Sequence, residues 1–295
     1  MEIIDDIKES FSMFTDLYDI LRLVDPINKK SIIIEENEYK EIEGSCYSFW
    51  KKDTFCDNCI AMRAYYEKDT CVRLEFKDEN ILLLIAVPIN LQKHHYILEI
   101  IKNISQESNF LKANTQAVDT ITQILNGMTE KFIKDEITGT FNKRYINERL
   151  IVDINTHLNK KLPLSVIMTT IDNLKYVKDI YGQGIGEKVL KDFAEVIRSS
   201  IDHSKDWVGR YSGETFLIVL NNTPIDKAYK TVEKIRRHIE NTHFEYGEIK
   251  VSITSSFGVT VTYDKMITID ELIASVDEKL YRAKKKRPNN IIKED

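Results

Sequence analysis

The segment between residues 104 and 132 constrains the fold most, because it separates two strand-rich parts of the chain with a long stretch that lacks proline. Apolar residues recur there at every seventh position: Ile104, Leu111, Val118, Leu125 and Phe132. This spacing is typical of a helix that pairs with a second helix in a coiled coil. A single amphipathic helix packed on its own domain is the alternative. We favour the dimerising helix, because connections inside one compact domain are usually much shorter.

The first part of the chain predicts a compact α+β domain over residues 1–104. Residues 3–23 have helical periodicity, and "VDPINKKSIIIEEN" (24–37) predicts a strand, a turn and a second strand. Three further strands are predicted within "TCVRLEF", "ILLLIAVPI" and "HYILEIIKNI". Short strands around a helical insert fit a domain of the size of a sensor.

The last part of the chain predicts an α/β sandwich over residues 135–290. A buried type of strand spans Leu164–Ile171, helices fill most of 173–202, and "VGRY" and "FLIVL" form a hairpin. A helix over 225–242, strands within 249–263 and a closing helix over 269–286 complete the pattern. Residues 105–134 would then be a signalling helix between two domains.

Charge and hydropathy exclude some classes of protein. The net charge of −5 gives no reason to expect a nucleic-acid partner. No apolar run approaches the roughly 20 residues that span a bilayer, so we expect no membrane span. The acidic start "MEIIDDIKES" is unlike a secretory signal, which predicts a cytoplasmic protein.

All four cysteines lie in the first quarter of the chain: Cys46, Cys56, Cys59 and Cys71. The C-x-x-C pair places two thiolates within reach of one ion, and two more cysteines would complete a tetrahedral set. This pattern predicts a site for zinc or an iron–sulfur cluster. A redox-switched Cys56–Cys59 pair and buried structural thiols are the alternatives.

Three stretches occur in an order and spacing that resemble the GGDEF domain of diguanylate cyclases. They are "DEITGTFNKRYINERL" (135–150), "TIDNLKYVKDIYGQGIGEKVLKDFA" (170–194) and "GRYSGETFLIVL" (209–220). The resemblance implies a domain that condenses two GTP molecules into cyclic di-GMP across a homodimer, with magnesium or manganese. The first domain resembles a PAS sensor in "RLVDP…KKSIII" and "YILEIIKNIS".

The metal positions implied by the resemblance are degenerate in this sequence. The family has an aspartate at the end of the first strand, where Thr170 stands, and acidic residues at Glu214 and Thr215. Only Glu214 is a carboxylate, and magnesium prefers several hard oxygen ligands. We therefore expect magnesium or manganese only if the site is active. Asp172, two residues beyond Thr170 in the strand, is the candidate replacement.

The nucleotide positions implied by the resemblance differ as well. Lys178 stands at the family's guanine-binding asparagine and Glu187 at its aspartate, while Ser212 replaces the first glycine of the signature turn. Lysine has donors and no acceptor, so it does not reproduce the paired contacts of an amide. These residues leave open whether the domain binds GTP or cyclic di-GMP.

Two other family sites are matched in part. The inhibitory R-x-x-D pair reads His203 and Asp206, and neutral histidine lacks the planar fork of arginine. Asp206 also fits a turn residue entering a strand. Lys284 matches a triphosphate-contacting lysine, but the arginine that the family has four residues later is Pro288, with Arg287 one position early. Lys284 also fits a solvated helix end.

Three functions are consistent with these residues. The first is a cyclic di-GMP signalling protein, in which the PAS-like domain is coupled to a regulatory and inactive GGDEF domain through a homodimeric linker. The second is an active cyclase with a reorganised metal site that uses Glu214 and Asp172. The third is a sensor whose ligand binds only the first domain.

Overall fold

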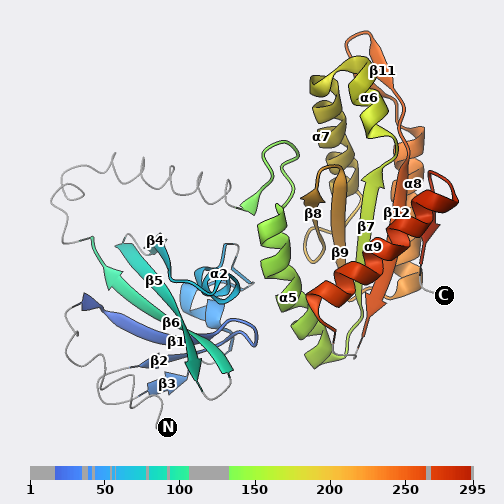
Figure 1. Ribbon diagram of the computed structural model, residues 1–295. Coiled ribbons are helices and arrows are strands. Elements are labelled where there is room, and N and C mark those ends of the chain that lie inside the picture. The colour runs from blue at the N-terminus through green and yellow to red at the C-terminus, as the bar shows by residue number, and fades with distance from the viewer. Residues whose placement is uncertain are drawn as a thin grey trace. The chain divides into compact units, whose positions relative to one another are not determined.

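The computed structural model describes residues 17–34, 39–41, 44–53, 55–56, 58–77, 80–91, 94–105, 133–263 and 267–293. The chain divides into two compact units, Met1–Phe132 and Ile133–Asp295 (Figure 1). Residues 106–132, which make up most of the predicted coiled-coil linker over 105–134, lie outside the described residues. No helix in the described ranges is long and apolar enough to cross a membrane.

The first unit is built on a six-stranded antiparallel sheet in the order β3-β2-β1-β6-β5-β4. Its strands are β1 (Ile20–Asp25), β2 (Lys30–Ile34), β3 (Tyr39–Glu41), β4 (Cys71–Lys77), β5 (Asn80–Leu91) and β6 (His94–Asn103). The short helices η2 (Cys46–Trp50) and α2 (Ile60–Glu67) lie between β3 and β4 in the chain and pack on a core formed with the sheet. Strands around a helical insert were predicted for this part of the chain, and the structure has them.

The prediction of a helix over residues 3–23 is wrong for its end, because Ile20–Leu23 belong to β1. Residues 3–16 lie outside the described part of the chain. Arg22 lies within this strand, and its side chain is almost fully buried. It donates to Glu99 of β6 at 3.0 Å, and the ring of Phe49 covers its guanidinium at 4.0 Å. This partner lies 77 residues away, so local periodicity gives no sign of it.

The second unit is a five-stranded sheet in the order β13-β12-β7-β9-β8 with helices on both faces. Its strands are β7 (Leu164–Ile171), β8 (Trp207–Ser212), β9 (Thr215–Asn221), β12 (Ser255–Thr262) and β13 (Ile291–Ile292). A separate pair consists of β10 (Phe244–Tyr246) and β11 (Ile249–Val251). Its helices are α5 (Lys143–Lys160), α6 (Leu174–Tyr181), α7 (Gln183–Ser199), α8 (Ile225–Asn241) and α9 (Ile269–Lys286).

Side chains of β7 alternate between the two cores of this unit, as the two-residue period of a strand requires. Ile167 and Ile171 pack with α6, α7 and α8, whereas Val166 and Met168 pack with α5 and α9. The predicted mixed α/β sandwich is thereby confirmed. Helix α5 was not predicted, although Asn142 caps its first turn by accepting a hydrogen bond from the Tyr145 amide.

Candidate functional site

Two threonines face each other at the end of the central strand. Thr170 of β7 is paired with Thr215 of β9 on one side and with Ser256 of β12 on the other. Residues directly opposite in an antiparallel pair have Cβ atoms about 4.5–5.5 Å apart. Thr170 is buried and Thr215 is partly buried. The strand register therefore places two neutral hydroxyl side chains at the two positions where the family resemblance implies carboxylates.

The signature hairpin is a tight turn between β8 and β9. Ser212 pairs with Thr215, and Gly213 and Glu214 form the two-residue loop. Gly213 has φ +44°, a conformation that favours glycine. Glu214 is half-buried at the tip and Ser212 is exposed. The turn thus presents Glu214 at the same end of the sheet as the threonine pair.

Arg210 fastens this turn to the segment that precedes α5. Its Nε donates to the Gly213 carbonyl at 2.8 Å, and its Nη1 contacts both carboxylate oxygens of Asp135 at 3.0 and 3.1 Å. Burial opposes ionisation of Asp135, but hydrogen bonds from Thr138 and Arg210 outweigh it and lower the pKa of this carboxyl. Arg210 and Asp135 both lie in the motifs that resemble the family, but the sequence does not indicate that they form an ion pair.

Asp172, the candidate replacement ligand, is buried and already hydrogen-bonded on both oxygens. Its Oδ1 accepts from the Ser256 hydroxyl at 2.8 Å, and its Oδ2 accepts from the Thr254 hydroxyl and the Asn289 amide, each at 2.8 Å. The Asp172 amide also donates to the Thr254 carbonyl. These contacts tie the end of β7 to the start of β12 and to the segment after α9, which is a structural task for the carboxylate.

The side chain of Lys178 in α6 packs against the next helix, α7. A Cβ placed on Gly186 of α7 would be 2.4 Å from Lys178 Cγ and 3.0 Å from its Cε, so the lysine stem rests against the glycine. Glu187, the next residue, accepts a hydrogen bond from Gln183 Nε2 at 2.9 Å. The residues at the family's two guanine-contacting positions thus lie on neighbouring helices, with the Lys178 stem packed against Gly186 and Glu187 hydrogen-bonded to Gln183.

The remaining predicted positions lie apart from the threonine pair. Asp206 is buried just before β8, where its Oδ1 accepts from the Asn221 amide at 2.9 Å, and burial raises its pKa. His203 is exposed in the preceding turn, and Lys284 is exposed near the end of α9. The Asp206 contact joins β8 to the end of β9, as a turn residue entering a strand does.

The four cysteines are free thiols, and Cys71 lies apart from Cys46, Cys56 and Cys59. Cys59 caps the start of α2, where its Sγ accepts from the Met62 amide. The Cys71 thiol donates to Glu67, the last residue of α2, at 3.6 Å. A helix of eight residues is about 12 Å long, so α2 separates these two thiols. The expected four-cysteine metal site is therefore wrong.

Cys46 and Cys56 are buried, Cys59 is partly buried, and all three are protonated thiols. Burial raises the pKa of Cys46 to about 12 and raises those of Cys56 and Cys59, and proximity of the thiols to one another adds to the shift in Cys46 and Cys59. In the part of the chain that the structure describes, no three histidine, cysteine or acidic side chains form a group that could hold a metal ion. Thiols with raised pKa values react slowly, which favours buried structural thiols over a redox pair.

A model of the family described as "Diguanylate cyclase, GGDEF domain" matches residues 132–290. The response regulator PleD of Caulobacter vibrioides is 29% identical over 170 residues, which cover 57% of this chain and 37% of PleD. Diguanylate cyclase A of Treponema denticola is 33% identical over 138 residues, 47% of this chain and 37% of that protein. The matched region thus spans little more than a third of these curated relatives.

Solved structures have the same fold. Diguanylate cyclase SiaD of Pseudomonas aeruginosa, in complex with its activator SiaC, aligns with a TM-score of 0.54 at 26% identity, over 61% of this chain and 69% of SiaD. The coiled coil and GGDEF domain of DgcB from Caulobacter crescentus, in complex with c-di-GMP, aligns with a TM-score of 0.58 at 19% identity. The latter alignment covers 64% of this chain and 100% of the DgcB chain, and shows the fold alone.

Proposed function

Because the chain belongs to the GGDEF diguanylate cyclase family, we propose that it is a cyclic di-GMP signalling protein whose GGDEF domain regulates and does not synthesise the nucleotide. The observation that best supports this proposal is the direct pairing of Thr170 in β7 with Thr215 in β9. At these two positions the family resemblance implies metal-binding carboxylates.

The side chains at this end of the sheet do not fit the metal ions that the family implies. Divalent magnesium needs several converging oxygens, usually with carboxylates among them. Glu214 is the one carboxylate among the three positions, and the threonine hydroxyls are neutral and weak ligands. Replacing two carboxylates removes about two negative charges beside a triphosphate. Metal-dependent phosphoryl transfer is therefore not expected here.

The contacts of Asp172 argue against the alternative of an active cyclase with a reorganised metal site. Its two oxygens accept three hydrogen bonds from Thr254, Ser256 and Asn289. These hydrogen bonds occupy three of the roughly four acceptor sites of the carboxylate and fix its orientation, which leaves at most one site on Oδ1 for a metal ion.

The regulatory part of the proposal assigns sensing to the first unit and dimerisation to the linker. The short strands around a helical insert in the first unit support the PAS resemblance of its sequence, and β6, which leads to the linker, lies beside β1 inside the sheet. A change in this core would reach the linker through β6. The four free thiols suit a reducing compartment, which supports a cytoplasmic location.

A cyclase assay on the purified full chain tests the proposal. With GTP and magnesium or manganese, we expect no cyclic di-GMP above a protein-free blank, while an active family member assayed in parallel gives product. Product detected by mass spectrometry and lost in Glu214→Ala would overturn the proposal and favour the active cyclase.

Calorimetry with GTP and with cyclic di-GMP separates the remaining alternatives. Binding of either nucleotide without turnover supports a nucleotide-responsive module. If neither nucleotide binds, the third function is favoured, in which the ligand binds only the first domain.

A further inference from the structure

Arg22 of β1 is a buried arginine whose side chain contacts three other elements of the first unit. Its Nη1 donates to Glu99 of β6 at 3.0 Å. Its Nη2 donates to the Ser31 hydroxyl of β2 at 3.1 Å and to the Cys46 carbonyl of η2 at 3.0 Å. The ring of Phe49, which also belongs to η2, covers the guanidinium at 4.0 Å. One side chain therefore holds both η2 and β6.

Stability alone is a poor explanation for the ion pair between Arg22 and Glu99. Their side chains are 1% and 4% exposed, and taking two charges out of water offsets much of their mutual attraction. Burial raises the pKa of Glu99 and Arg22 opposes this shift, so loss of either partner leaves the other as an unfavourable buried charge. The pair does fix the orientation of the guanidinium, and that orientation sets the contacts with η2.

The η2 segment is a short 3₁₀ helix with a turn at each end. Gly44 before it and Lys51 after it have φ of +94° and +55°, in the left-handed region. Cys46 is buried, whereas the aromatic side chains of the segment are only partly buried. Its hydrogen bonds to the strands include the Arg22 contact and one from the Cys46 amide to the Lys29 carbonyl at 2.6 Å. Short segments of this kind open more readily than the strands of a core.

We propose that Arg22 couples η2 to β6, so that release of either element from the guanidinium loosens the other. Without Glu99 the guanidinium loses its fixed orientation and holds Cys46 and Phe49 less firmly. Coupling between two sites is reciprocal, so release of η2 weakens the hold on β6 to the same extent. The strand β6 ends at Asn103, next to the linker. The inference goes beyond the proposed function, because it concerns the first unit alone and does not depend on whether the second unit makes cyclic di-GMP.

Alkylation of Cys46 in the full chain measures the release of η2, because this thiol is buried while η2 is in place. We expect Glu99→Gln to raise the rate of alkylation by iodoacetamide at least about fivefold, since it weakens a hydrogen bond between charged groups. Peptide mass spectrometry resolves the thiols, and Cys71, which contacts Glu67 of α2, is the internal reference. An unchanged rate at Cys46, or an equal rise at Cys46 and Cys71, would overturn the coupling.

Hydrogen exchange of β6 in the full chain measures the reverse direction. Phe49→Leu removes the ring that covers the guanidinium and should raise the exchange rate of β6 amides about threefold or more. The same substitution should leave β6 unchanged in a protein that carries Arg22→Met and Glu99→Leu, where apolar side chains replace the ion pair. A rise of equal size in both backgrounds would show that Arg22 carries no coupling.

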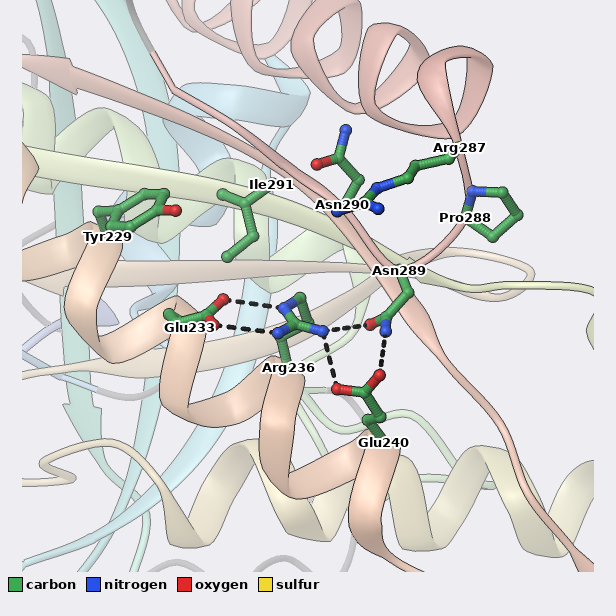
Figure 2. Close-up of a pocket in the computed structure, with 9 residues that line it drawn as sticks. All are labelled: Tyr229, Glu233, Arg236, Glu240, Arg287, Pro288, Asn289, Asn290 and Ile291. Atoms are coloured by element: carbon green, nitrogen blue, oxygen red, sulfur yellow. Dashed lines mark hydrogen bonds and ion pairs between the residues drawn. The ribbon is translucent and has the colours of Figure 1, made fainter.

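The second unit offers a matched control for general loss of stability. Arg236 of α8 also contacts carboxylates, with Glu233 at 2.8 and 3.0 Å and Glu240 at 3.0 Å, at the side of a polar pocket (Figure 2). Arg236→Met breaks this network in a unit that contains neither η2 nor β6, and should leave the alkylation of Cys46 within about twofold of the wild type. A change as large as that in Glu99→Gln would mean that the label reports overall stability, which would refute the proposal.

Discussion

At the scale of single residues, chemistry in this domain is decided by partners that lie far away in the sequence. Asp172 receives donors from Thr254 and Ser256, more than 80 residues downstream, and from Asn289, 117 residues downstream. The placement of the Lys178 side chain likewise depends on Gly186, because a residue without a side chain leaves room for the lysine stem. The family resemblance predicts which motif position each residue occupies. The contacts in the folded domain determine what each side chain does.

The contact between Lys178 and Gly186 predicts an interaction between two substitutions. In a Lys178→Ala background, Gly186→Ala should stabilise the protein by up to about 1 kcal/mol, because alanine is the better helix former. In the wild type the new methyl group would meet the lysine stem at 2.4 Å, which should remove this gain. Urea denaturation of the four proteins measures the difference; an equal effect of Gly186→Ala in both backgrounds would contradict the contact.

At the scale of secondary-structure elements, strand register determines what the site can bind. The pairing of β7 with β9 makes Thr170 and Thr215 immediate neighbours. Two carboxylates at these positions would converge with Glu214, whereas one carboxylate alone would sit in a mostly buried and uncompensated position. The expected effects of the two substitutions are therefore not additive.

Restoring both carboxylates should restore metal-dependent nucleotide binding. We expect Thr170→Asp combined with Thr215→Glu to raise the affinity for magnesium–GTP, while either substitution alone does little. The single Thr170→Asp variant should also lose stability, because a buried charge without a partner is unfavourable. Calorimetry measures the affinity, and Glu214→Ala in the double variant should remove the gain. Equally tight magnesium–GTP binding by the wild type would show that the threonines do not impair the site.

The contact between Arg210 and Asp135 predicts a pH-dependent contribution to stability. The pKa of Asp135 is lowered in the folded protein, so its stabilisation is present above its usual pKa of about 3.9 and is lost as pH falls through the folded value. Asp135→Asn should therefore destabilise by about 1 kcal/mol near pH 7, with a difference that shrinks below pH 4. Thermal melts from pH 7 to pH 3 measure it, with the exposed neighbour Glu136→Gln as the control. A difference that is constant with pH would argue against the ion pair.

Sequence patterns predicted where helices and strands lie better than they predicted which residues contact one another. The bounds predicted for β7 and α9 agree with the structure, because β7 is a mostly apolar run typical of a buried strand and α9 is a long segment with helical periodicity. The prediction that residues 20–23 are helical was wrong. Arg22 is buried and forms an ion pair with Glu99, and local periodicity does not reveal a partner so far away in the sequence. Likewise, four cysteines close in sequence suggested a metal site, and the length of α2 between Cys59 and Cys71 ruled it out.

At the scale of the whole molecule, the two units are joined by a segment that lies outside the described residues, so the coiled coil stays a prediction. Its heptad pattern places Leu111, Val118 and Leu125 on one side of a helix. A pair of such helices would bring two GGDEF domains into one particle, which is the arrangement that the family resemblance implies.

We expect the full chain to be a homodimer that Val118→Glu converts toward monomer. Burying each apolar residue of this seam contributes roughly 1.5–3 kcal/mol before the loss of chain entropy, and the substitution places a charge there on both chains. Light scattering measures the mass, and Gln116→Glu, two residues away and off the seam, is the matched control. A dimeric mass for Val118→Glu would move the interface elsewhere, and a monomeric wild type would remove it.

The threonine pair of β7 and β9 also has a consequence for the history of the domain. Facing β-branched residues favour strand pairing, whereas clustered carboxylates repel one another until a cation arrives. On the proposed function, either single reversion would lower stability without restoring an ion site. On the same proposal, a lineage that has acquired both threonines would regain an ion site only through two changes at once, and selection would maintain the domain for other reasons.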